Sequence, residues 1–194
     1  MSKKKAVRVQ RGAGAKKFKI SDAKSGIVFV GNPVLRQKAR LVKNIKAAQP
    51  LIRAMVKKLR AIQGAGLAAP QIGKSLRLFV VEVRRNDLFP HRSESGLFVV
   101  INPRIVRRSG TAQRGWEACF SIPGYIGEVL RHETITLEYT DAVGTKVTKK
   151  FSGYLARVMQ HEYDHIEGHV YVDRMTDMHT FSTVENWGMF HLDA

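Results

Sequence analysis

The stretch Gln-His-Glu-Tyr-Asp-His at residues 160–165 decides how the rest of the chain is interpreted. On a helix, residues four positions apart lie on one face about one turn apart, so His161 and His165 can bind the same metal ion. Glu162 follows the first histidine and can reach a water molecule on that ion. This HExxH arrangement is typical of metal-dependent hydrolases, in which a metal-activated water attacks a carbonyl. The alternative is a helix with two surface histidines.

Length and composition fit one folded domain. The 194 residues can bury a sizeable core, and a hydrophobic fraction of 44% is ordinary for a globular protein. No run of 18 apolar residues occurs, so we expect no transmembrane helix. Cys119 is the single cysteine, which excludes an internal disulfide and fits a reducing compartment.

The formal net charge of +17 is unevenly distributed. Residues 1–49 hold fourteen Lys or Arg and one acidic residue, Asp22. We predict that residues 1–25 form a basic, flexible arm and that residues 26–194 form the folded domain. A basic arm suggests contact with nucleic acid, a ribosome or an anionic membrane surface. An organelle transit peptide and a solvated tail without a partner are the alternatives.

Two helices stand out. Apolar residues recur at helical spacing over 48–63, which predicts an amphipathic helix that Gly64 ends. The second helix, over 152–167, is expected to be capped by Ser152 and ended by Gly168. It is apolar over much of its circumference, so it should be largely buried, together with the HExxH motif.

Strands are expected between the two helices. The β-branched and aromatic runs lie at 76–83, 97–106, 135–139 and 146–151. Residues 64–73 are rich in Gly and Pro and are interpreted as a close-packed loop, and residues 169–194 as a short apolar stretch with an irregular end. This order predicts an α+β fold, in which antiparallel strands wrap around a central buried helix carrying HExxH, with one N-terminal amphipathic helix.

Cys119, expected to lie between strands, offers a third metal ligand. One thiolate and two imidazoles leave a fourth position for water, which is the catalytic pattern rather than the structural one. Glu162 can then act as general base and pass the proton to the leaving amine. The side-chain amide of Gln71 and the backbone N–H of Phe120 are candidate donors to the oxyanion. The alternative for Gln71 is that it only holds its loop in place.

Three separated segments together resemble the motifs of peptide deformylases. They are Gly-Ala-Gly-Leu-Ala-Ala-Pro-Gln at 64–71, Glu-Ala-Cys-Phe-Ser at 117–121, and residues 160–165. Their order and spacing agree with the family, and the similarity extends over about residues 28–175. The resemblance implies removal of the formyl group from N-formylmethionyl nascent peptides. It also implies one divalent metal, natively Fe²⁺ and replaceable by Zn²⁺, Ni²⁺ or Co²⁺.

The resemblance implies three groups of site residues. The metal ligands are Cys119, His161 and His165. The catalytic groups are Glu162, Gln71 and the backbone of Phe120. The substrate-binding residues are Gly64, Ala65, Gly66, Trp116, Tyr154 and Val158. In this family the two glycine positions bind the peptide backbone, and the other four residues would line an apolar pocket for the methionine side chain. For those four, ordinary core packing is the alternative.

The second motif departs from the family pattern, which usually reads Glu-Gly-Cys-Leu-Ser. Phe120 acts through its backbone, so its side chain is expected to be tolerated. Ala118 adds a Cβ at a position where the resemblance implies either close approach of the substrate or a backbone shape that favours glycine. An alternative is therefore a deformylase-like paralogue with weak or redirected amidase activity. Residues 121–131 look most like deformylases of eukaryotic organelles, which favours a mitochondrial or other organelle matrix over a bacterial cytoplasm.

Two further expectations complete the interpretation. Glu117 and Arg131 should form an ion pair that fixes the segment carrying the cysteine ligand, as is common in the family. A function of a different class is also open, namely a non-catalytic ribosome- or RNA-binding protein with a structural metal. A general HExxH endopeptidase is disfavoured, because the expected third ligand is an upstream cysteine.

Overall fold

The computed structural model describes residues 26–85 and 93–191. The predicted basic arm, residues 1–25, lies outside the described residues. Within the described ranges, no helix combines the length and apolar character needed to cross a membrane.

Eight strands form two antiparallel sheets in the described part of the chain. The larger sheet has the order β1 (Gly66–Ala68), β2 (Leu78–Val81), β3 (Phe98–Arg108), β6 (Thr134–Thr140) and β7 (Lys146–Ser152). The smaller has the order β4 (Ala112–Cys119), β5 (Ile122–His132) and β8 (Ser182–Thr183). Every neighbouring pair is antiparallel. The prediction of a mixed fold built on antiparallel strands is therefore confirmed.

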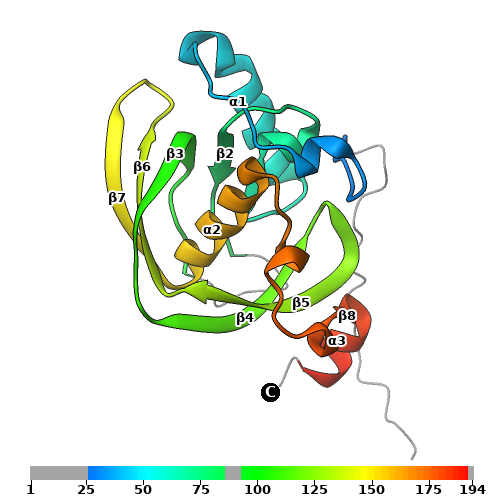
Figure 1. Ribbon diagram of the computed structural model, residues 1–194. Coiled ribbons are helices and arrows are strands. Elements are labelled where there is room, and N and C mark those ends of the chain that lie inside the picture. Colours follow the sequence, from blue (N-terminus) through cyan, green and yellow to red (C-terminus); the bar gives the residue numbers. More distant parts are fainter. Residues whose placement is uncertain (1–25, 86–92, 192–194) are drawn as a thin grey trace, which may run out of the picture.

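Three α-helices and several 3₁₀ turns accompany the sheets in the described ranges. The α-helices are α1 (Ile45–Ala61), α2 (Gly153–Glu167) and α3 (Val184–Phe190). The 3₁₀ turns are η2 (Pro33–Arg36), η3 (Ala69–Ile72), η4 (Tyr171–Arg174) and η5 (Met178–Thr180). Figure 1 shows β3, β6 and β7 to one side of α2, β2 near its upper end, and β4 and β5 passing below it.

Helix α1 covers one part of the larger sheet. Asn44 caps it by accepting a hydrogen bond from the backbone N–H of Ala47 at 2.9 Å. Ile52, Met55 and Leu59 are buried along one side and belong to the same hydrophobic cluster as residues of β2. The amphipathic pattern of the sequence thus identified this helix.

Helix α2 contacts strands of both sheets and buries Ala156, Met159 and Ile166 completely. Gly168 ends it in the left-handed region at φ 86°, and a Cβ there would lie 3.0 Å from the backbone of Arg36. Glycine is therefore needed for both the turn and the close approach. Ser152 occupies the N-cap position, but its side chain makes no capping hydrogen bond.

Three local expectations are wrong. Residues 64–73 are not all loop, because Gly66–Ala68 pairs with β2 as strand β1 and Ala69–Ile72 is a 3₁₀ turn. Cys119 is not between strands but is the last residue of β4, which the sequence analysis missed together with β5. Residues 169–191 are less irregular than expected, since they hold β8 and α3.

Candidate metal centre

Cys119, His161 and His165 converge inside the molecule. Their ligand atoms all lie within 4.8 Å of one another. Sγ of Cys119 is 3.3 Å from Nε2 of His165, and the two imidazole rings are 5.0 Å apart at an interplanar angle of 79°. A thiolate and two imidazoles at these separations are a donor set suited to a divalent transition metal.

The strand end at Cys119 is shaped by an irregularity in the β4–β5 pairing. The register shifts between Ala118 and Cys119, which pairs with Ile122 at the tight turn into β5. Such a shift turns a side chain away from the regular alternation of the strand. The backbone N–H of Ser121 donates to Sγ of Cys119 at 3.4 Å, which helps to hold the sulfur in place.

The surroundings of Cys119 lower the pKa of its thiol and so favour the thiolate. Burial raises its pKa, but the neighbouring His165 and His161 lower it by more, so the pKa lies well below its ordinary value. The thiolate is the form that binds metals. The centre thus favours the charge state that coordination requires.

His161 is oriented by the buried carboxylate of Glu117. Its Nδ1 is 2.9 Å from Oε2 of Glu117, which leaves Nε2 for a ligand. Arg131 donates from Nε and Nη2 to the two oxygens of the same carboxylate, each at 2.9 Å. The expected Glu117–Arg131 ion pair is confirmed. Burial raises the pKa of Glu117, but the hydrogen bonds from His161 and Arg131 and the charge of Arg131 bring it well below its usual range.

Arg157 is a member of this network that the sequence analysis missed. Its Nη1 donates to Oε1 of Glu117 at 2.9 Å and to the carbonyl of Val129 at 2.9 Å, and its Nη2 donates to the carbonyl of Gln113 at 2.7 Å. A Cβ on Gly115 would lie 2.8 Å from the guanidinium. A sequence signal existed, because Arg157 precedes His161 by one helical turn on a helix expected to be buried.

Asp164, inside the HExxH stretch, extends the network. It accepts from Arg131 and from Arg174, whose Nη2 is 2.8 Å from Oδ1 of the carboxylate. Ion pairs of two carboxylates with three guanidinium groups therefore fix α2 against β4, β5 and η4. The carboxylates are those of Glu117 and Asp164, and the guanidinium groups those of Arg131, Arg157 and Arg174. Such a hydrogen-bonded set holds the histidine ligand in one orientation.

Glu162 is 3% exposed, and its Oε2 has no hydrogen-bond partner among the described residues. Burial raises its pKa to about 7, the nearby imidazoles oppose that rise, and the charges of Cys119 and Glu117 add to it. A Cβ on Gly66 would lie 2.7 Å from the Cδ of this carboxyl, so only glycine leaves room for it. A buried carboxyl without a partner, next to the three donors, is suited to proton transfer.

Gln71 lies beside the sulfur. Its Nε2 is 3.4 Å from Sγ of Cys119 and 3.5 Å from Oγ of Ser121, and its Oε1 accepts from the backbone N–H of Ala68 at 2.8 Å. The amide is therefore oriented with its donor towards the centre. Phe120 is half-buried, and its ring would lie 2.8 Å from a Cβ on Gly64.

The predicted pocket residues are spread over several environments. Val158 is 7% exposed and Ala65 packs against the same hydrophobic cluster. Trp116 is half-buried and lies against Trp187 of α3 at 6.0 Å between rings. Tyr154 is 41% exposed and lines a mainly polar pocket of about 190 Å³ that includes Arg157 but none of the other three.

Comparison with known families assigns the chain. The sequence model described as polypeptide deformylase matches residues 24–181, which is most of the chain. The chain belongs to this family.

Curated deformylases from bacteria and plants are similar to it. Peptide deformylase 2 of a Nostoc species is 42% identical over 151 residues, which are 77% of this chain and 84% of that protein. Peptide deformylase 1A, chloroplastic/mitochondrial, of Arabidopsis thaliana is 36% identical over 188 residues, which are 90% of this chain and 69% of that protein.

Solved deformylase structures share the fold. A Met-Ala-Ser-bound class I type b peptide deformylase from Acinetobacter baumannii gives a TM-score of 0.74 at 33% identity, and covers 77% of this chain and 96% of that one. The peptide deformylase from Thermotoga maritima gives a TM-score of 0.71 at 34% identity, with coverage of 78% and 97%.

Proposed function

We propose that this protein is a metal-dependent hydrolase that removes the formyl group from N-formylmethionyl peptides. One observation carries the proposal, namely that three donors within 4.8 Å lie beside a buried carboxyl that has no partner in the described residues. Residues 26–194 would form the catalytic domain, with antiparallel strands wrapped around the helix that carries HExxH.

Cys119, His161 and His165 would hold one divalent metal. When bound there, the metal supplies Lewis-acid chemistry, because it lowers the pKa of a water molecule and polarises the formyl carbonyl. We favour Fe²⁺ as the native ion, and the same donors accept Zn²⁺, Ni²⁺ or Co²⁺. Glu117 supports this assignment, since it directs one nitrogen of His161 towards the other donors.

Proton transfer is assigned to Glu162. Its free carboxylate oxygen would accept a proton from water as the oxygen attacks the formyl carbon, and would pass that proton to the departing amine nitrogen. The C–N bond breaks, and the products are formate and a peptide with a free α-amino group. The amide of Gln71 and the backbone N–H of Phe120 would donate to the developing oxyanion.

Substrate binding is assigned to the segments beside the centre. The backbones of Gly64 and Gly66 would bind the peptide chain, as the resemblance to the family implies. A Cβ at Gly64 would displace Phe120, and a Cβ at Gly66 would displace Glu162. The methionine side chain would enter a pocket to which Ala65, Trp116, Tyr154 and Val158 contribute.

A redirected amidase is the second candidate, and Ala118 is the observation that favours it. This residue is exposed beside the cysteine ligand, at the position where the family usually has glycine. If the added methyl group hinders the peptide, Ala118→Gly should raise activity on formyl-methionyl substrates. A variant with unchanged kinetics would remove this candidate.

The proposed location rests on the relatives, and the proposed partner on the charge of residues 1–25. An organelle matrix is our proposal and a bacterial cytoplasm the alternative, since both plant organellar and bacterial deformylases are similar to this chain. The basic residues 1–25 would contact the ribosome, where formylated chains emerge. Deleting these residues should weaken ribosome co-sedimentation, and unchanged co-sedimentation would refute that contact.

The direct test is formate release from formyl-Met-Ala-Ser by protein loaded anaerobically with Fe²⁺. We expect turnover that Glu162→Ala abolishes while the variant keeps its metal. No turnover by the fully loaded wild-type protein would reject the proposed reaction.

A further inference from the structure

A row of side chains crosses three strands of the larger sheet, away from the metal centre. Arg107 of β3 pairs with Thr136 of β6, and Thr136 pairs with Lys150 of β7. Directly opposed residues on neighbouring strands project from the same face of a sheet. Strands lie about 4.8 Å apart, so the two cations project from backbone positions about 10 Å apart with a hydroxyl between them.

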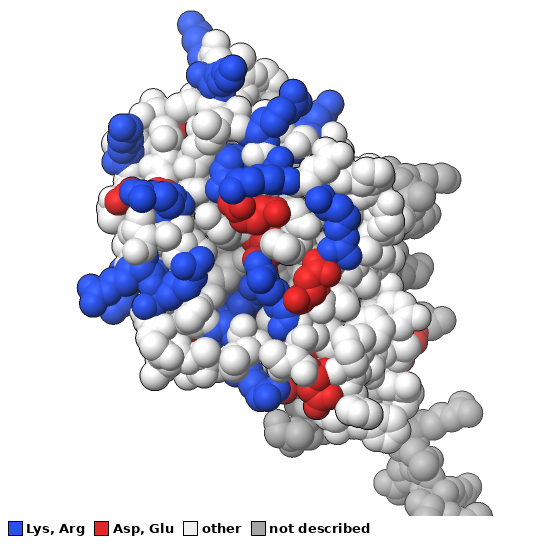
Figure 2. All heavy atoms as spheres, in the orientation of Figure 1, with Lys and Arg blue, Asp and Glu red and all other residues white. Residues whose placement is uncertain are grey.

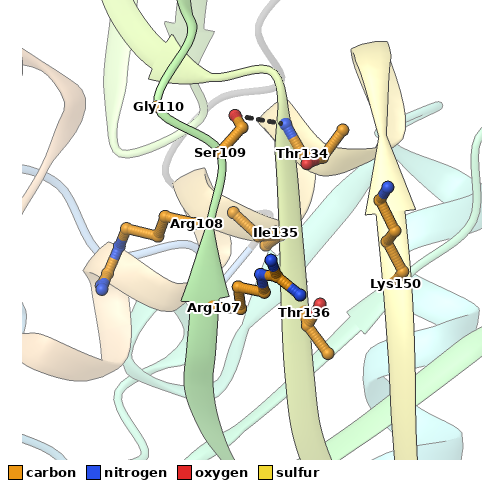
Figure 3. A pocket seen from close by; sticks show the side chains of 8 residues that line it. All are labelled: Arg107, Arg108, Ser109, Gly110, Thr134, Ile135, Thr136 and Lys150. Carbon is orange, nitrogen blue, oxygen red and sulfur yellow. Dashed lines mark hydrogen bonds between the residues drawn. The ribbon is translucent and has the colours of Figure 1, made fainter.

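This row lines a pocket of about 370 Å³. Its lining residues are Arg107, Arg108, Ser109, Gly110, Thr134, Ile135, Thr136 and Lys150. Figure 3 shows the guanidinium of Arg107 reaching from β3 towards Thr136, with Lys150 beyond it on β7 and Arg108 pointing the other way. The pocket contains no acidic residue, and its single aliphatic lining residue, Ile135, is 1% exposed.

In the neighbouring row of side chains on these strands, the arginine has a carboxylate partner, which the residues lining the pocket lack. Arg104 of β3 faces Glu138 of β6 and makes an ion pair with it at 2.7 Å. Among the described residues, no carboxylate pairs with Arg107 or Lys150. Two unpaired cations held in one pocket repel each other, and a bound anion would remove that repulsion.

Two local features shape the pocket. The register of β3 on β6 shifts between Ile105 and Arg107, and this bulge places Arg107 opposite Thr136. At the rim, Oγ of Ser109 donates to the carbonyl of Thr111 at 2.8 Å and accepts from the backbone N–H of Thr134 at 3.1 Å. Ser109 is thereby committed to the turn, so the ligand-binding groups are Arg107, Lys150 and Thr136.

We propose that this pocket binds a phosphate group of an RNA backbone. A guanidinium, an ammonium and a hydroxyl are groups that contact phosphate oxygens in nucleic-acid complexes. Ile135, the one aliphatic residue of the lining, is 1% exposed, so the pocket offers no apolar side chain to the acyl chains of a lipid. Figure 2 shows further Lys and Arg side chains on the side of the molecule where β3, β6 and β7 lie, so the approach of a polyanion is favoured.

RNA binding at this pocket is separable from hydrolysis, because none of its lining residues belongs to the metal centre. The test variant is Arg107→Ala/Lys150→Ala, made in the full chain. The matched control is Arg53→Ala/Lys57→Ala, which removes the same charge from exposed positions on α1. Binding of each protein to a fluorescent RNA hairpin is measured over a range of salt concentrations, beside formate release from a short formylated peptide.

We expect the pocket variant to bind RNA about fivefold to tenfold more weakly, with a salt dependence reduced by about one to two units on the log–log scale. The control should lose much less, and formate release should stay unchanged in both. Equal RNA affinity of wild type and pocket variant would overturn the proposal, as would an equal loss in the control. Pocket-dependent binding to phosphatidylserine vesicles, without loss of RNA affinity, would reassign the site to lipid headgroups and overturn it too.

A single substitution tests the same proposal if the double variant does not fold. Lys150→Gln changes one exposed side chain on the edge strand β7 and should lower RNA affinity in the same direction. If this variant releases formate normally and binds RNA like the wild type, the pocket is not an RNA site.

Discussion

At the scale of single residues, the centre depends on space as much as on charge. Gly66 leaves room for the carboxyl of Glu162, and Gly64 leaves room for the ring of Phe120. The unpartnered oxygen of Glu162 then has nothing in the described chain to hold it, which suits a group that exchanges protons with water and substrate.

Replacing Glu162 by glutamine keeps the shape and removes the base. We expect Glu162→Gln to lower kcat about 10³-fold, within the range of general acid–base catalysis, while one metal ion stays bound. Formate release and metal content measured on the same sample check this. Glu185→Gln, an exposed change on α3, is the control and should be unaffected. A Glu162→Gln variant with normal turnover would assign the proton transfer to another group.

Sequence reasoning located the candidate donors but not the groups that orient them. The i, i+4 spacing and the lone cysteine were enough to bring Cys119, His161 and His165 together. Glu117–Arg131 was expected from the family resemblance. Arg157 was not, because its role depends on which carbonyls of β4 and β5 lie above α2, and those contacts join segments about 28 to 44 residues apart.

At the scale of elements, α2 is attached to the smaller sheet through Arg157. Its guanidinium reaches a carboxylate and backbone carbonyls of both β4 and β5. The position of Glu117, and through it of His161, therefore depends on a residue that touches neither substrate nor metal ligand atoms. Arg157 is a positioning residue.

Removing this guanidinium should loosen the metal centre. We expect Arg157→Met to weaken metal affinity about tenfold, as is usual when a group supporting a ligand is lost, with less change in kcat of the fully loaded enzyme. Chelator competition measures the affinity. Arg157→Lys keeps the charge but loses the planar fork, so it should restore the affinity only in part. Wild-type affinity in Arg157→Met would show that the clamp is dispensable.

Two ion pairs of Glu167 fix the C-terminal end of α2. The carboxylate of Glu167 forms ion pairs with Nη1 of Arg77 at 2.6 Å and with Nζ of Lys38 at 3.1 Å. Burial raises the pKa of Glu167, but the hydrogen bonds from Arg77 and Lys38 lower it by more, so it lies below its ordinary value. Because the folded-state pKa is lower than the unfolded one, this stabilisation is present above the unfolded pKa and disappears as the pH falls through the folded pKa.

Glu167→Gln should therefore lower the free energy of unfolding by about 1 kcal/mol at pH 7, a value reduced by solvent screening of a partly exposed group. The difference should shrink as the pH falls below about 4.5, the region where glutamate titrates. Urea unfolding at several pH values measures it. A difference that is the same at pH 3 and pH 7 would contradict the electrostatic origin.

At the scale of the whole molecule, the β-branched and aromatic runs predicted β6 and β7 well, and helical spacing predicted α1 and α2 to within a few residues. Strands β4 and β5 were missed because their sequences are interrupted by glycine and proline, at Gly115, Pro123, Gly124 and Gly127. These segments are strands because β4 and β5 pair with each other, which the sequence of either one does not reveal. The basic pocket was not predictable either, since it requires β6 to insert between β3 and β7, and strand order is a tertiary property.

The central claim is that one metal held by Cys119, His161 and His165 drives the reaction. Metal-free protein, prepared with a chelator and titrated anaerobically with Fe²⁺, tests it when bound iron and formate release are measured together. We predict that turnover rises in proportion to bound iron and saturates at one ion per chain. Full turnover in the metal-free protein, or a saturated centre without turnover, would contradict the account.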